Sequence, residues 1–167
     1  MPDGGRPATS YFQYRDMFAL LQNQATGMPA LDAEADFRRA RRRHAAARVR
    51  RWVARRSDWR HPLTLEDPAV HLGGLSRMQV VPLTAIVGTL EPTRQFDACF
   101  RPASDVVRRR WERIALAHRR GDALPPIELV KRPEGCYMLD GRHRVSVARA
   151  LGHPDIDARV TGARPRS

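Results

Sequence analysis

An alternation of strand-like and helix-like segments runs through the second half of the chain and restricts its fold more than any other feature. Apolar residues there come either in short strand-like runs or at helical spacing. Six segments carry the pattern, in the order strand, helix, strand, strand, helix and strand: 78–90, 104–119, 127–130, 135–139, 142–151 and 156–160. This order predicts an α/β (α+β) domain built on a small mixed sheet.

Single residues support the boundaries of these segments. Ser104 is the kind of residue that caps the start of a helix, and Gly152 stands where helices commonly end in a left-handed residue. Cys136 falls inside the strand over 135–139, so we expect its thiol to serve as a small core residue rather than a reactive one.

Length and cysteine content narrow the class of protein. A chain of 167 residues suits one domain with an appended arm. It has no apolar run of the roughly 20 residues that a membrane span needs, and no apolar centre of a signal peptide. Two cysteines, Cys99 and Cys136, indicate neither a disulfide framework nor a zinc site. We therefore expect a cytoplasmic protein, associated with the nucleoid if it binds DNA.

The charge of the chain points to a class of partner. Lysine and arginine total 30 against 18 aspartates and glutamates, which gives a net charge of +12, and Lys131 is the only lysine. The planar guanidinium group of arginine binds phosphate oxygens in pairs. A basic excess of this size predicts a partner that carries phosphates, either nucleic acid or nucleotide.

Composition divides the chain into four parts. Residues 1–30 are expected to form a flexible N-terminus with a short helix over 11–24, and residues 31–77 an arginine-rich helix and a linker. Residues 78–162 hold the mixed-sheet domain, and residues 163–167 form a tail. The arginine-rich helix is thus predicted to be an arm that precedes the domain.

The arginine-rich helix combines an apolar stripe with a strip of cations. The stripe is expected to pack, the indole of Trp52 included; its members are Phe37, Ala40, His44, Ala45, Val49, Trp52 and Val53. Three roles are open for the cations: contact with nucleic-acid phosphates, docking on an acidic protein, or a solvated face. We favour DNA bound with little or no sequence specificity. The arginines assigned to it are Arg38, Arg39, Arg42, Arg43, Arg50, Arg51 and Arg55.

The stretch YMLDGRHRVSVARALG, residues 137–152, places three basic residues at the first turn of a helix. The helix dipole disfavours cations there, so we expect a bound anion, held by free amides after the glycine turn. Without ligand, Arg144→Ala is expected to leave stability unchanged or slightly raised, and Gly141→Val to crowd an approaching phosphate. The alternative is that His143 packs under the helix and the arginines are solvated.

Three segments together resemble the N-terminal domain of ParB-type chromosome-partitioning proteins, whose fold is shared with sulfiredoxin. They are GTLEPTRQFD at 88–97, LPPIELV at 124–130 and the stretch at 137–152, and the resemblance covers roughly half of the chain. It implies a ParB/sulfiredoxin-like domain of bacterial origin.

The resemblance also implies a nucleotide site. The corresponding turn holds the phosphates of CTP in ParB-type proteins and those of ATP in sulfiredoxin, so CTP or ATP is the expected cofactor, with Mg²⁺ as a candidate companion. Arg142 stands in place of the reactive cysteine of sulfiredoxin, so we do not expect this protein to repair sulfinic acids. The nucleotide contacts carried over to this chain are Thr93, Arg94, Gly141, Arg142, His143 and Arg144.

Asp140 is the one candidate for a catalytic residue. It would hold Mg²⁺ against a phosphate or act as a base toward a hydroxyl. Local preferences favour the simpler alternative that Asp140 and Gly141 form a turn pair. Asp97 likewise either faces the site or caps its loop.

Together these features predict a ParB-like protein that binds nucleotide phosphates and DNA, in chromosome partitioning or transcription. A homodimer is a candidate assembly. The first alternative is an enzyme on the same fold, either a phosphotransferase or a ParB-like nuclease. The second is a non-catalytic regulatory adaptor. We favour a binding protein over an enzyme.

Overall fold

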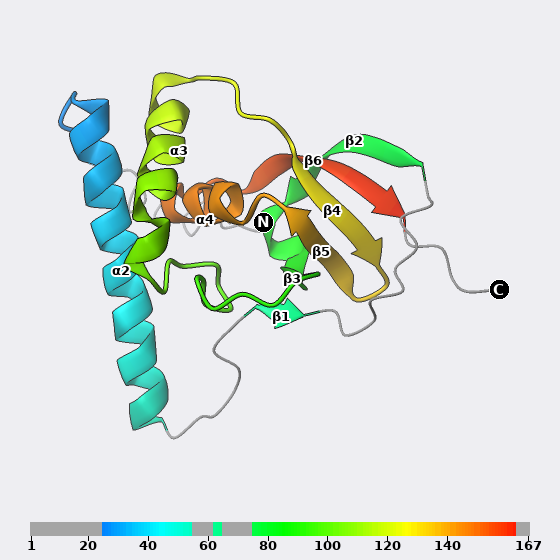
Figure 1. Ribbon diagram of the computed structural model, residues 1–167, viewed down its shortest axis with the longest axis horizontal. Helices are drawn as coiled ribbons and strands as arrows, with labels where there is room; N and C mark the ends of the chain where they lie inside the picture. The colour runs from blue at the N-terminus through cyan, green and yellow to red at the C-terminus, as the bar shows by residue number, and fades with distance from the viewer. Residues whose placement is uncertain (1–24, 55–61, 65–74, 163–167) are drawn as a thin grey trace, which may run out of the picture.

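The computed structural model describes residues 25–54, 62–64 and 75–162 (Figure 1). The helix expected over 11–24, Arg55 and the tail at 163–167 lie outside these residues. The described helices are α2 (Pro29–Val53), α3 (Arg108–Arg120) and α4 (Arg142–Leu151). Figure 1 shows α2 and α3 side by side, with α4 between them and the sheet. None of these helices is both long and apolar enough to span a bilayer.

The sheet of the described residues is mixed, as predicted. Its strands are β1 (Leu63–Thr64), β2 (Ser76–Pro82), β3 (Ile86–Thr89), β4 (Ile127–Arg132), β5 (Gly135–Asp140) and β6 (Asp155–Gly162). They lie in the order β1-β3-β5-β4-β6-β2. The pairs β1–β3, β3–β5 and β4–β6 are parallel, whereas β4–β5 and β2–β6 are antiparallel. The predicted fold class is therefore confirmed.

One expected strand proves to be two. The segment 78–90 divides at Pro82 and the 3₁₀ turn Leu83–Ala85 into β2 and β3, which lie on opposite sides of the central pair β4–β5. Pro82 has no backbone N–H to donate to a neighbouring strand, and this favours the end of β2 there. The predicted linker also contributes the two residues of β1, which pair with β3.

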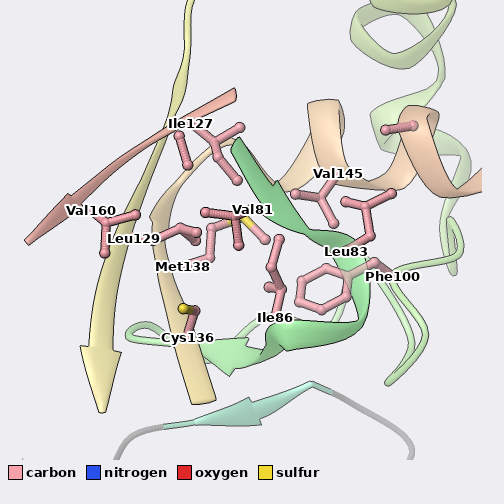
Figure 2. Close-up of a cluster of buried hydrophobic side chains, with 12 residues drawn as sticks. Val81, Leu83, Ile86, Phe100, Ile127, Leu129, Cys136, Met138, Val145 and Val160 are labelled. Atoms are coloured by element: carbon pink, nitrogen blue, oxygen red, sulfur yellow. The ribbon is translucent and has the colours of Figure 1, made fainter. Parts of the chain in front are cut away.

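The sheet and α4 enclose the first part of the core (Figure 2). Ile127, Met138 and Val145 have no exposed surface, and they connect β4, β5 and α4. Cys136 is buried among these side chains, as predicted, and burial raises the pKa of its thiol. Two predicted helix boundaries are also confirmed. Ser104 caps a helix start by accepting a hydrogen bond from the amide of Val106, and Gly152 ends α4 with a left-handed φ of 83°.

A second part of the core lies between α2 and α3. The rings of Phe37 and Trp111 meet edge to face at 5.5 Å, and the indole N–H of the fully buried Trp111 donates to Ser146 Oγ over 2.9 Å. Arg119 of α3 also forms an ion pair of 2.7 Å with the buried Asp36 of α2. The N-terminal half of α2 is thus part of the packed domain, rather than an arm that only precedes it.

The predicted apolar stripe of α2 is correct only in its first half. Phe37, Ala40 and His44 are buried, but Val49, Trp52 and Val53 are exposed. The stripe was wrong beyond His44 because the buried face of α2 follows its contact with α3 and α4, and no described element covers the helix further on. Sequence periodicity cannot show where such a contact ends.

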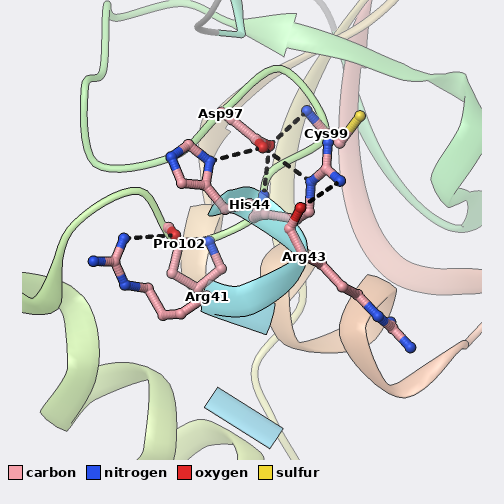
Figure 3. A network of polar contacts seen from close by, with 7 residues as sticks. Arg41, Arg43, His44, Asp97, Cys99 and Pro102 are labelled. Carbon is pink, nitrogen blue, oxygen red and sulfur yellow. Dashed lines mark hydrogen bonds and ion pairs between the residues drawn. The ribbon is translucent and has the colours of Figure 1, made fainter. Parts of the chain in front are cut away.

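A buried carboxylate joins α2 to the loop that follows β3 (Figure 3). Asp97 has no exposed surface and accepts hydrogen bonds from the amides of Cys99 and Arg101, from Arg101 Nε at 2.9 Å and from His44 Nδ1 at 3.0 Å. Phe100 takes a left-handed φ of 59° within this turn and donates its amide to the Asp97 carbonyl. Asp97 was expected either to face the site or to cap its loop, and the structure supports the role in the loop.

We expect Asp97→Asn to lower the free energy of unfolding by about 2–4 kcal/mol, because it leaves the partly buried Arg101 and the buried His44 without their carboxylate partner. Urea denaturation at pH 7 measures this change. Asp122→Asn is the control, since Asp122 is exposed and its substitution should change stability by less than about 0.5 kcal/mol. Equal effects of the two substitutions would contradict the role of Asp97.

Candidate anion site at the first turn of α4

The candidate site begins where β5 ends and α4 starts. Gly141 lies between them with a φ of 113°, and no side chain caps the first amides of α4. A Cβ at Gly141 would lie 2.4 Å from Ile127 Cγ2. The missing side chain at Gly141 makes room for β4, so Gly141→Val would disturb the core as well as crowd a phosphate, and loss of binding in this variant would not test the phosphate contact alone.

A cavity of about 240 Å³ opens beside this turn. Its charged and titratable lining consists of Glu91, Arg110, Asp140, Arg142, His143 and Arg144. Glu91 comes from the loop after β3 and Arg110 from α3, and the remaining four residues come from the end of β5 and the start of α4. Three segments distant in the sequence therefore meet at one small, polar space, to which α3 and the start of α4 bring cations and the loop after β3 brings a carboxylate.

Arg142 forms an ion pair with a carboxylate that lies largely in solvent. Its guanidinium group donates to Glu91 Oε2 over 2.8 Å, and 75% of the Glu91 side chain is exposed, against 23% of Arg142. Arg142 Nε is buried and has no hydrogen-bond partner among the described residues. An entering anion could replace Glu91 at little cost, because exposed ion pairs contribute little to stability.

Arg144 has a different role from the one expected. Its guanidinium group donates to the carbonyls of Pro125 and Pro126 and to Asp140, and only 11% of its side chain is exposed. It thereby connects α4 to the segment that enters β4. The structure speaks against the expectation that its removal leaves stability unchanged or raised, since Arg144→Ala would remove the donor to an exposed and a partly buried carbonyl and the cation that pairs with Asp140.

Arg110 is a member of the site that sequence reasoning missed. It is exposed on α3 and forms no hydrogen bond or ion pair with any described residue. The run Arg108–Arg110 gave no sign of its place, because only the packing of α3 on α4 brings one of its members to the cavity. Gln95 also lines the cavity without having been predicted.

His143 is not a cation in this structure. Burial is the main cause of a pKa lowered to about 4, and the nearby Arg110 and Arg142 contribute in the same direction. Its ring meets that of the buried Phe96 edge to face at 5.2 Å. The surroundings of His143 thus agree better with the alternative of a packed ring than with a cation that binds phosphate, although the ring still borders the cavity.

Two predicted contacts from the loop after β3 lie away from the cavity wall. Thr93 is buried, and its hydroxyl accepts a hydrogen bond from the amide of Gln95 over 3.2 Å. Arg94 is exposed, and neither residue lines the cavity. Asp140 lies at the cavity and forms an ion pair with Arg144. This contact suits a structural residue at the turn into α4, and a catalytic role for Asp140 stays a prediction.

The arginines assigned to nucleic acid occupy different environments on α2. Arg39 is partly buried and forms an ion pair of 3.1 Å with Asp36, and Arg51 is also partly buried. Arg41, which was not predicted, is held by Asp105 and by the carbonyl of Pro102. The exposed members of the predicted set are Arg38, Arg42, Arg43 and Arg50, and Arg55 lies outside the described residues.

The lowered pKa of His143 gives a signed dependence of stability on pH. The unfolded chain binds a proton at His143 near pH 6.5, but the folded protein does so only near pH 4. The free energy of unfolding should therefore fall as the pH is lowered from 6.5 to about 4, with no contribution from His143 above that window. Urea denaturation across this range should show a smaller slope for His143→Gln. A His143 pKa near 6.5, measured by NMR, would contradict the prediction.

Comparison with solved structures finds a likeness of fold. The fold is similar to that of sulfiredoxin from Arabidopsis thaliana, with 21% sequence identity and a TM-score of 0.41, over 52% of this chain and 86% of that one. No protein-family model matches the chain, and no curated protein matches it. The likeness concerns the fold alone, and the resemblance to ParB-type domains remains a prediction from the three sequence segments.

Proposed function

We propose that the protein binds the phosphate groups of a nucleotide in the cavity at the first turn of α4 and binds nucleic acid along α2. One observation carries the first part. Arg110, Arg142 and the uncapped amides of α4 surround a cavity in which the described partner of the Arg142 guanidinium group is the exposed Glu91. Helix N-termini with adjacent arginines favour phosphate oxygens.

The size of the cavity indicates which part of a nucleotide it accepts. About 240 Å³ is smaller than the roughly 300–1,000 Å³ of pockets that enclose a drug-sized ligand. The cavity therefore suits a chain of phosphates, with the sugar and base outside it. Affinity should depend more on the number of phosphates than on the identity of the base.

The residues at the cavity suit phosphate better than a resident metal ion. Both carboxylates there are paired with arginines, Glu91 with Arg142 and Asp140 with Arg144. In the part of the chain that the structure describes, no group of three or more His, Cys, Asp or Glu could hold a metal. Mg²⁺ would instead arrive with the nucleotide, whose charge it would partly neutralise.

Calorimetry with CTP and ATP tests the cavity. Arg110→Ala should weaken binding by about 10- to 100-fold, because it removes a charged contact. Arg142→Ala should do the same while changing the free energy of unfolding by less than about 1 kcal/mol. Glu91→Gln should strengthen binding, since it removes the carboxylate that competes with the ligand.

Arg113→Ala is the matched control for Arg110→Ala. Arg113 is also exposed on α3, but it does not line the cavity. Equal losses of affinity for the two variants would show that general charge, and not the cavity, binds the nucleotide. Absence of binding by the wild-type protein would contradict the first part of the proposal.

The second part of the proposal depends on the charge of α2. The segment from Phe37 to Val53 contains 8 arginines and no acidic residue. The guanidinium groups of Arg42 and Arg48 are exposed and have no hydrogen bond or ion pair with a described residue. Such groups can neutralise phosphates without first losing an internal partner.

The double variant Arg42→Ala/Arg48→Ala should bind DNA duplexes of any sequence more weakly. The slope of log affinity against log salt concentration should fall by roughly 2, because each neutralised phosphate releases about one counterion. Fluorescence anisotropy at several salt concentrations measures this slope. Arg77→Ala, an exposed cation on β2 far from α2, should leave it unchanged. An unaltered slope for the double variant would remove α2 from the proposal.

A further inference from the structure

We infer that the exposed half of α2 binds single-stranded nucleic acid, with Trp52 as the platform on which an unpaired base stacks. The inference rests on the second part of the proposed function and specifies its substrate. It starts from the correction made above: Trp52 does not pack within the described domain.

Trp52 is an unusually exposed aromatic residue. Its side chain lies 81% in solvent, whereas Trp111 on α3 is fully buried. Val49 and Val53, next to it on the helix, are 61% and 68% exposed. Single exposed apolar residues are common, but an indole with apolar neighbours on a helix surface is typical of a binding surface.

Helical spacing places this indole in line with cations. Residues three or four apart lie on the same side of a helix, so one line runs from Arg38 through Arg42 and Ala45 to Arg48 and Trp52. At a rise of about 1.5 Å per residue, the line is roughly 21 Å long. The apolar side chains and the arginines therefore share one face instead of lying on opposite faces.

A strand of unpaired nucleotides matches both properties of this face. In a duplex, the bases stack on one another and present only their edges. The indole of Trp52 therefore has no free base to stack on, and the arginines alone would bind the duplex through its phosphates. An unpaired base has a free flat face, and its stacking on an aromatic side chain tolerates any sequence. Arg48 and Arg42 would contact phosphates of the nucleotides that continue from the stacked base toward the N-terminus of α2.

The same face fits an acidic protein less well. A helix that docks on a protein buries a continuous apolar stripe. Here arginines interrupt the stripe, and the described apolar neighbours of Trp52 on this face are limited to Ala45 and the two valines. The absence of acidic residues from Phe37 to Val53 suits a polyanion along the whole line.

The test compares oligo(dT), oligo(U) and a DNA duplex of equal length, with anisotropy as the readout and the full chain as the protein. Trp52→Ala should weaken binding to the single strands by on the order of tenfold and leave duplex binding within about twofold. Trp52→Phe should retain most of the affinity, since the ring is kept. Val80→Ala is the control and should change neither, because Val80 is a 64% exposed apolar residue on β2, away from this face. In a Trp59→Phe background, single strands should also quench the fluorescence of Trp52.

Each outcome decides between the two proposals. A loss of affinity confined to the single strands in Trp52→Ala supports the inference, whether oligo(dT) and oligo(U) bind equally or one binds more tightly. If the wild-type protein binds duplexes but Trp52→Ala affects single strands and duplexes alike, the inference is overturned while the proposed function stands. If no nucleic acid binds, both the inference and the second part of the proposed function fail.

Discussion

The buried carboxylate of Asp97 holds together the parts of the molecule on which both binding surfaces depend. A charge without exposed surface is tolerated only when its lone pairs are used, and Asp97 satisfies this with two amides, Arg101 and His44. The network fixes the loop after β3 from within, so that Glu91 and Gln95 lie against α4. It also secures α2 at His44, the last buried residue before the exposed half of the helix.

The cavity at α4 shows how a protein can keep cations at a helix start without a ligand. The dipole disfavours Arg142 and Arg144 there, and each is compensated by a carboxylate or a carbonyl from another segment. The two arginines differ in what compensates them. Arg144 is held by acceptors of the folded chain and maintains the domain, whereas Arg142 has an exposed partner that an anion could displace. Two arginines in one helical turn therefore have different roles: Arg144 stabilises the fold, and Arg142 is available for binding.

Much of the fold could be predicted from the sequence. The periods of 2 and 3.6 residues located β4, β5, β6 and both helices of the second half, because these periods reflect contacts with one adjacent layer. The division of the segment 78–90 was missed, although Pro82 was visible, since a proline is compatible with a strand edge as well as with its end. The docking of α2 was also missed, because its ion pairs with Arg119 join residues more than eighty positions apart.

The sequence by itself determined the local features of the candidate site: a strand, a glycine in a left-handed conformation, and cations in the first turn of a helix. These follow from interactions between near neighbours in the chain. Only the tertiary structure decided that Arg110 and Glu91 complete the cavity, that Arg144 is held by proline carbonyls, that His143 is neutral and that Trp52 is exposed. Each of these depends on burial or on partners from distant segments, because the packing of α2, α3 and the loop after β3 determines which groups lose their contact with water.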